Sequence, residues 1–205
     1  MTPIMFDREI QIRQGAYLPH WTKEGGIYHI RFRLADSLPQ EKLREWKEER
    51  KEILKEAARQ KRRLSVSEQK RLDFLYSAKV EKWLDAGHGA CWLRQNEVAS
   101  IVATTLHFFH EDRYRLLVWC VMPNHVHVLM EPITHSLVDI LDSWKKFTAR
   151  KANKMLGREG KSFWQREYFD HLIRNREHLE RTSNYIWNNP EAAGLVNWKW
   201  RWRME

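Results

Sequence analysis

The sequence lacks most features of secreted and membrane proteins. Its two cysteines, Cys91 and Cys120, lie far apart and without the spacing of a metal site, which favours a reduced protein over a disulfide-linked one. No N-terminal apolar stretch suits a signal peptide, and no run of about 18 apolar residues could span a bilayer. No internal repeat is visible. We therefore expect a soluble cytoplasmic protein with no membrane partner.

Size and charge point to a polyanionic partner. The 205 residues suffice for one well-packed domain with an elaboration. Thirty-six Lys and Arg residues oppose 27 Asp and Glu residues, which gives a formal net charge of +9. Such a surplus favours nucleic acid first and an acidic membrane second. Of the 11 tryptophans, those beside basic residues could stack on unpaired bases, whereas most should pack in the interior.

Hydrophobic periodicity predicts an α+β domain rather than a parallel doubly wound sheet. Strands are expected over 27–34, 113–122 and 125–131, and helices over 96–108, 137–155 and 175–189. Residues 163–169 are interpreted as an aromatic turn or a short strand, and no element is assigned to residues 1–26. The order of elements and the short hairpin connection indicate an antiparallel sheet with helices packed on it, of ferredoxin-like character.

Two segments stand apart from this single domain of residues 1–205. Residues 40–84 are dense in Glu, Lys and Arg and predict a helical insertion that breaks near Ser65, where Ser65 or Ser67 could cap a second helix. The insertion has too few apolar residues for its own core, and either a DNA-facing role or a solvated hairpin is open. The basic, Trp-rich tail 197–205 is either an edge strand or a base-stacking strip.

Two histidines follow a Pro-Asn turn in an apolar run. Residues two apart in a strand share a face, so His125 and His127 should project together, while Val126 and Val128 pack on the opposite face. Two imidazoles on an apolar face are costly to bury without partners, and together they could clamp a divalent ion. The alternative is a pair of histidines that are hydrogen-bonded within a core.

The last predicted helix offers a phenol and a third ligand. Tyr185 and Asn189 lie four residues apart and so share a helix face. Because Pro190 disfavours helix at the position before it, the Asn189 side chain is expected at a frayed end and free to reach outward. An amide oxygen is a suitable ligand for Mg²⁺ or Mn²⁺. A phenol near such an ion suits attack on a phosphodiester. The alternative is that Tyr185 only packs against neighbouring side chains, as most aromatic residues in helices do.

Several ordered blocks resemble a known family. Residues 122–129 are similar to the HUH motif (His, hydrophobic residue, His) of single-tyrosine transposases. Residues 163–166, 171–175, 185–190 and 193–196 resemble the downstream signature of the REP-associated tyrosine transposases (RAYTs). The resemblance covers roughly residues 110–197, and the strand that begins near Tyr28 is compatible with the first strand of the family.

The resemblance implies both a fold and a mechanism. It implies the ferredoxin-like HUH fold, with Tyr185 as nucleophile, His125 and His127 as ligands of Mg²⁺ or Mn²⁺, and Asn189 completing the site. It also implies that single-stranded DNA next to a hairpin is cleaved to a 5′-phosphotyrosine and a free 3′-OH that can be rejoined. The partner is therefore single-stranded or hairpin DNA, and the chain could act as a monomer or as a homodimer.

Basic and aromatic side chains are predicted to contact the DNA phosphates or bases. They are Lys145, Lys146, Arg150, Lys151, Trp164, Gln165, Arg166, Arg174, Trp200 and Arg201. Each could instead belong to a solvated or packed surface. Two other functions are open: a non-catalytic hairpin-DNA-binding protein on the same scaffold, and an HUH replication initiator or relaxase.

Overall fold

The computed structural model describes residues 11–14, 19–23, 25–65, 67–68, 71–72 and 78–205. The chain divides into two compact units. The first comprises Met1–Ala35 and Trp92–Glu205, and the second comprises Asp36–Cys91. The predicted insertion over 40–84 lies within the second unit. Among the helices described, none combines the length and the apolar composition that a membrane crossing requires.

The first unit is built on a five-stranded sheet of order β6-β3-β5-β4-β7, in which all neighbours are antiparallel. Its strands are β3 (Tyr28–Arg33), β4 (Tyr114–Val121), β5 (His125–Pro132), β6 (Phe169–Leu172) and β7 (Arg201–Arg203). A second, two-stranded sheet pairs β1 (Gln11–Gln14) with β2 (Pro19–Thr22), where no element was predicted. The antiparallel α+β fold predicted from periodicity is confirmed.

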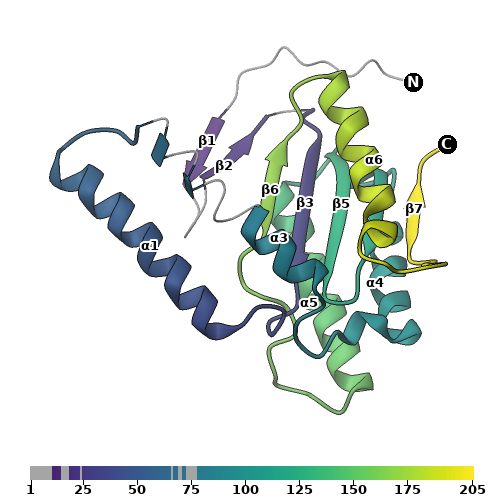
Figure 1. Cartoon of the computed structure of the whole chain (residues 1–205). Coiled ribbons are helices and arrows are strands. Elements are labelled where there is room, and N and C mark those ends of the chain that lie inside the picture. Colours follow the sequence, from purple (N-terminus) through teal and green to yellow (C-terminus); the bar gives the residue numbers. More distant parts are fainter. Residues whose placement is uncertain (1–10, 15–18, 24, 66, 69–70, 73–77) are drawn as a thin grey trace. The chain divides into compact units, whose positions relative to one another are not determined.

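Helices cover both faces of this sheet (Figure 1). The short 3₁₀ helix η1 (Trp92–Arg94) leads into α4 (Asn96–Phe108), and α4 and α5 (Leu137–Met155) pack on one face, while α6 (Arg176–Ala192) packs on the other. The larger core, next to α4 and α5, includes Ile30, Phe32, Leu106, Val126, Val128 and Trp144. A smaller core next to α6 includes Val118, Cys120, Leu129, Ile173 and Ile186. The predicted bounds of α4 and α5 are confirmed.

The predicted tight connection between the two central strands is also present. Pro123 and Asn124 form the turn between β4 and β5, which is closed by a hydrogen bond of 2.8 Å from the Met122 N–H to the His125 carbonyl. Strand β7 pairs with β4. Of the two alternatives for the segment 197–205, the structure therefore forms the edge strand.

Helix α6 departs from the sequence-based prediction at its C-terminal end. It continues through Pro190, although it was expected to end at Asn189. Proline cannot donate a hydrogen bond within a helix, but the carbonyls of Asn189 and Pro190 still accept from Ala193 and Leu195 at 3.0 and 2.8 Å. Consequently Asn189 is 3% exposed, so the expectation of an outward-reaching side chain at a frayed end was wrong.

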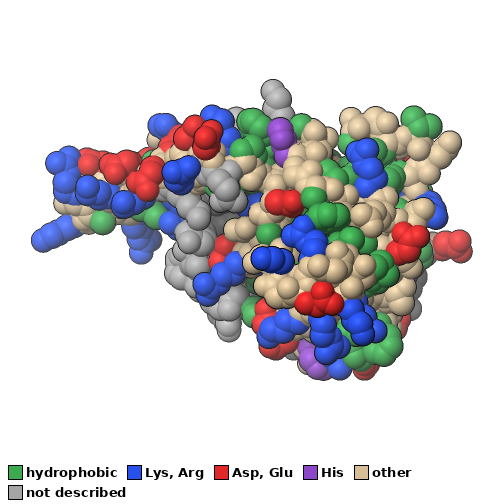
Figure 2. Space-filling view, turned by 90° about the horizontal axis from the view of Figure 1, so that it is seen from below, with side chains coloured by type: hydrophobic (Ala, Val, Ile, Leu, Met, Phe, Trp, Pro, Cys, Tyr) green, Lys and Arg blue, Asp and Glu red, His purple; other side chains and the backbone are tan. Residues whose placement is uncertain are grey.

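The second unit contains α1 (Gln40–Arg59) and α3 (Ala78–Asp85). Contrary to expectation it has a small core of its own, formed by Leu38, Trp46, Val80 and Leu84. Of the two serines predicted as caps, Ser65 makes the hydrogen bonds of a capping box: its hydroxyl accepts from the Glu68 N–H at 3.2 Å, and the Glu68 carboxylate accepts from the Ser65 N–H at 2.8 Å. Side chains of both signs are interspersed along α1, at the left of Figure 2, so this helix does not present a surface of one charge.

Candidate active site

Strand β5 places the predicted histidine pair beneath α6. His125 and His127 are both 0% exposed and share their sheet face with Leu129 of the smaller core. Val126 and Val128 point to the opposite face and pack in the larger core. The alternation expected from the sequence therefore holds, and it buries two imidazoles.

The buried imidazoles form a hydrogen-bonded row. The Nε2 atoms of His125 and His127 face each other at 3.0 Å. Nδ1 of His125 lies 2.7 Å from Oδ1 of Asn124, and Nδ1 of His127 lies 3.0 Å from Nε2 of His29 on β3. Because an amide oxygen only accepts, Nδ1 of His125 carries the proton in its contact with Asn124. Its Nε2 lone pair is thus directed at His127.

Burial and neighbouring cations keep these histidines neutral. Burial first, and then the Arg31 guanidinium, lowers the pKa of His29 to about 3. The pKa values of His125 and His127 are held well below the usual range, chiefly by burial. Arg31 and Arg33 lie opposite His127 and His125 in the strand register and disfavour further positive charge. Neutral imidazole is the form that binds metal ions.

Tyr185 lies against this row. Its ring centroid is 5.6 Å from that of His127, with the two planes at 86°, and 6.1 Å from that of His29. The residue is 37% exposed, so its ring packs on the histidines while part of it remains open to solvent. Tyr185 therefore lies beside the histidine pair, as the sequence predicted.

The residues fit a divalent metal ion. Oδ1 of Asn189, one helical turn beyond Tyr185, is buried and has no hydrogen-bond partner among the described residues. Two ligands that lie about 2.1 Å from one ion at right angles are about 3 Å apart, which matches the separation of 3.0 Å between the Nε2 atoms of His125 and His127. No three His, Cys, Asp or Glu side chains of the described ranges form a metal-ligand group. An amide oxygen such as that of Asn189 is a donor that Mg²⁺ and Mn²⁺ accept.

The predicted DNA contacts on α5 lie away from the histidines. This helix covers the sheet face opposite α6. Lys146, Arg150 and Lys151 are exposed there. Lys145 is half-buried and its Nζ donates to the Arg166 carbonyl at 2.6 Å. The structure therefore does not bring these four residues of α5 together with Tyr185.

The remaining predicted DNA contacts have varied surroundings. Trp164 is 7% exposed and its indole donates to Thr148 at 2.8 Å, so the structure gives it a packing role and does not fit base stacking. The Trp200 indole donates to Asn96 at 3.1 Å. Gln165 is partly buried, Arg166 and Arg174 are exposed, and Arg201 binds α6.

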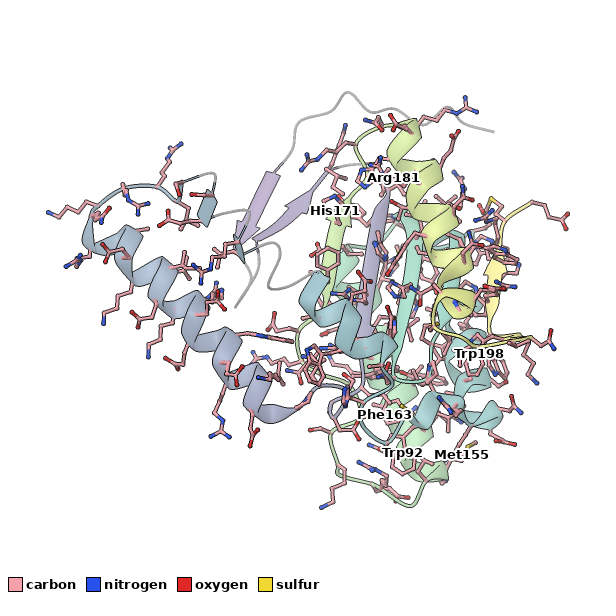
Figure 3. All side chains as sticks on the ribbon, viewed as in Figure 1. Trp92, Met155, Phe163, His171, Arg181 and Trp198 are labelled. Atoms are coloured by element: carbon pink, nitrogen blue, oxygen red, sulfur yellow. The ribbon has the colours of Figure 1, made fainter. Side chains whose placement is uncertain are left out.

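Sequence reasoning missed His29, Asn124 and Arg31. For His29 and Arg31, the sequence signal was the alternation of β3, because both residues occupy the face opposite Ile30. Polar residues at every second position of a buried strand indicate a polar face. His171 on β6, labelled in Figure 3, pairs with His29 in the register and extends this face.

The part of the chain that carries this site is similar to known transposases. A sequence model described as "Transposase IS200 like" matches residues 93–189, which include both histidines, Tyr185 and Asn189. The region 93–189 is thus similar to the IS200-like transposases. The resemblance to REP-associated tyrosine transposases is confirmed by this match together with a curated relative.

The curated relative is a protein of Haemophilus influenzae that is provisionally named a REP-associated tyrosine transposase. It is 33% identical over 87 residues, covering 38% of this chain and 49% of the relative. The chain thus spans about half the length of this curated protein.

Two solved structures are also similar. One is a REP-associated tyrosine transposase bound to a REP hairpin, with 16% identity, a TM-score of 0.46, and coverage of 90% of this chain and 74% of that chain. The other is a provisionally named transposase of Deinococcus radiodurans, with 15% identity, a TM-score of 0.33, and coverage of 80% and 89%.

Proposed function

We propose that this protein is a metal-dependent endonuclease and strand transferase of single-stranded DNA, with Tyr185 as its nucleophile. The observation that carries the proposal is the packing of the Tyr185 ring, at 5.6 Å between centroids, on an imidazole of the buried His125–His127 pair. The similarity of residues 93–189 to the IS200-like transposases supports the same reaction class.

The chain's own residues supply the covalent chemistry. The Tyr185 oxygen attacks phosphorus and forms a new P–O bond, while the bond from phosphorus to the 3′-oxygen breaks. The phenol proton passes to solvent, and the departing 3′-oxygen takes up a proton from solvent. The products are a 5′-phosphotyrosine and a free 3′-OH. Attack by a 3′-OH on the phosphotyrosine restores the phenol and rejoins the DNA.

His125, His127 and Asn189 would hold Mg²⁺ or Mn²⁺. When bound, the ion would polarise a non-bridging phosphate oxygen and orient the phosphate for attack. The two imidazoles contribute neutral nitrogen donors, because burial lowers their pKa values. The Asn189 oxygen contributes a donor that otherwise stays buried without a hydrogen bond among the described residues.

The DNA is proposed to carry a hairpin, as in REP-like palindromic elements. This follows from the resemblance to the REP-associated transposases and from the name of the curated relative. The net charge of +9 supports binding to the phosphate backbone, which does not depend on sequence. Bases left unpaired beside the hairpin would be available for stacking on aromatic side chains.

The proposal is tested with end-labelled single-stranded hairpin DNA, in the presence of Mn²⁺ or of a chelator. We expect a protein–DNA adduct that resists denaturation, formed only with the metal ion. Tyr185→Phe should abolish the adduct and retain DNA binding, because it removes one oxygen and leaves the ring contact with His127.

His127→Ala should abolish Mn²⁺-dependent cleavage, since it removes one of the two facing Nε2 atoms. Cleavage by Tyr185→Phe would remove Tyr185 from the nucleophile role, and normal cleavage after chelation would remove the metal. Tight hairpin binding with neither adduct nor cleavage would instead favour a non-catalytic DNA-binding protein.

A further inference from the structure

We propose that His29 is a positioning residue for the metal site: it accepts a hydrogen bond from Nδ1 of His127 and thereby keeps Nε2 of His127 bare for the metal ion. The inference rests on the proposed metal-dependent function and concerns a residue outside the pair of histidines and the tyrosine already assigned. The geometry that supports it is the contact of 3.0 Å between Nε2 of His29 and Nδ1 of His127.

The His29 ring is held on several sides. It stacks on His127 with ring centroids 5.2 Å apart and planes at 23°. Phe169 and Tyr185 each make an edge contact with it, at 6.1 Å between centroids. Since β3 and β5 are hydrogen-bonded neighbours, His29 and His127 are also fixed by the sheet. The contact therefore belongs to a packed arrangement.

The row of hydrogen bonds allows two proton arrangements. The Asn124 oxygen fixes the proton of His125 on Nδ1, so Nε2 of His125 is bare. If His127 carries its proton on Nε2, it donates to His125, and the metal site is closed. If the proton is on Nδ1, His127 donates to His29, and two bare Nε2 atoms face each other at 3.0 Å.

Only the second arrangement binds a metal ion. Two lone pairs at that separation repel unless a cation lies between them. A histidine ligand usually donates its other ring N–H to an acceptor, which fixes the tautomer and orientation of the ring. Asn124 serves this purpose for His125, and His29 serves it for His127. Both ligands of the pair thus have a dedicated acceptor.

The test measures Mn²⁺ binding to the DNA-free protein by the electron paramagnetic resonance signal of free Mn²⁺. His29→Leu removes the acceptor and should weaken binding about 10- to 100-fold. His29→Gln supplies an amide oxygen that can accept from Nδ1 and should stay within a few-fold of the parent protein. His171→Leu is the matched control, because it lies beside His29 in the sheet register; its affinity should not change.

A second measurement uses the unaltered protein, in case His29→Leu does not fold. Nitrogen-15 spectra of the imidazoles with bound Mg²⁺ should show the proton of His127 on Nδ1. A proton on Nε2 of His127 in the metal-bound protein would overturn the proposal.

The outcomes separate the two proposals. If the parent protein binds no Mn²⁺ or Mg²⁺, the metal-dependent function fails and the role of His29 fails with it. If the parent protein binds Mn²⁺ and folded His29→Leu binds it equally well, only the role of His29 fails. A loss in His29→Leu that His29→Gln restores supports the positioning role, since a packing defect would not depend on an acceptor atom.

Discussion

At the scale of single residues, neutral imidazoles buried beside cations are the most unusual feature of this chain. His29, His125 and His127 occupy one sheet face together with Arg31 and Arg33. Burying the charged form of an imidazole in such a place is costly. The histidines therefore stay neutral in the folded chain, and this has a consequence for stability.

We expect the metal-free protein to lose stability as the pH falls from about 6.5 towards 3. The pKa of His29 is about 3 in the folded chain against a model-peptide value of 6.5, so in this range the unfolded chain binds a proton that the folded chain does not. The free energy of unfolding is then largest above pH 6.5. It decreases below this pH by up to about 1.4 kcal/mol per pH unit for each such histidine. Urea midpoints at pH 7 and pH 5 measure the decline.

The interval from pH 7 to pH 5 lies above the pKa of ordinary carboxyl groups, which keeps their contribution small. His29→Gln should flatten the dependence on pH, because it removes one titrating group. An unchanged urea midpoint between the two pH values in the parent protein would contradict the buried neutral histidines.

The residue scale also shows what a sequence can disclose. His125 and His127 were predicted because two imidazoles alternate in an apolar run. The spacing of one helical turn made Tyr185 and Asn189 candidates only, and their roles came from the resemblance to the transposase family. His29 was missed because its contact with His127 depends on the register of β3 against β5. That register depends on long-range pairing, which periodicity alone does not reveal.

At the scale of elements, α6 is tied to the sheet by the C-terminal strand β7. Arg203 Nη2 donates to the Ser183 carbonyl at 2.9 Å and to Asn184 Oδ1 at 3.2 Å, next to Tyr185. Arg201 donates to the Trp187 carbonyl at 2.7 Å. Strand β7 therefore fixes the helix on which the proposed nucleophile lies.

Replacement of Arg203 by methionine should destabilise the protein by about 2 kcal/mol, because it leaves acceptors of α6 without a charged donor. Chemical denaturation gives the free energy of unfolding. The matched control is Arg176→Met, which lies on α6 itself. There an exposed ion pair with Glu180 at 3.1 Å should contribute less than about 0.5 kcal/mol. Equal effects of the two substitutions would show that β7 does not anchor α6.

The elements differ in how well sequence predicts them. Helices α4 and α5 have strong apolar stripes and were placed to the residue. Helix α6 was predicted to end before Pro190, but the residues after the proline continue the turn and supply donors to the carbonyls that precede them. The small core of the second unit was also missed, because Leu38 and Trp46 meet Val80 and Leu84 across a long sequence separation.

At the scale of the whole molecule, the second unit is inserted at one turn of the first. The Leu34 N–H donates to the Asn124 carbonyl at 2.8 Å, and the Leu93 N–H donates to the Pro123 carbonyl at 3.1 Å. The chain thus leaves the first unit and re-enters it beside the same turn. A short connection between these points costs little loop entropy.

Replacing residues 36–91 by a short Gly/Ser linker should therefore leave the first unit folded. Its helix and strand content, measured by circular dichroism, and its Mn²⁺ affinity should match those of the corresponding part of the full chain. A change confined to the affinity for hairpin DNA would assign DNA contacts to the second unit. An unfolded product would show that the first unit requires the second.

The central claim is that Tyr185 becomes covalently joined to the 5′ end of the cleaved DNA strand. Tandem mass spectrometry of a protease- and nuclease-digested adduct, formed with Mn²⁺ and a single-stranded hairpin, tests it most directly. The account predicts a nucleotide phosphate on Tyr185 of the peptide from α6. A phosphate on any other residue, or cleaved DNA with no modified peptide, would contradict it.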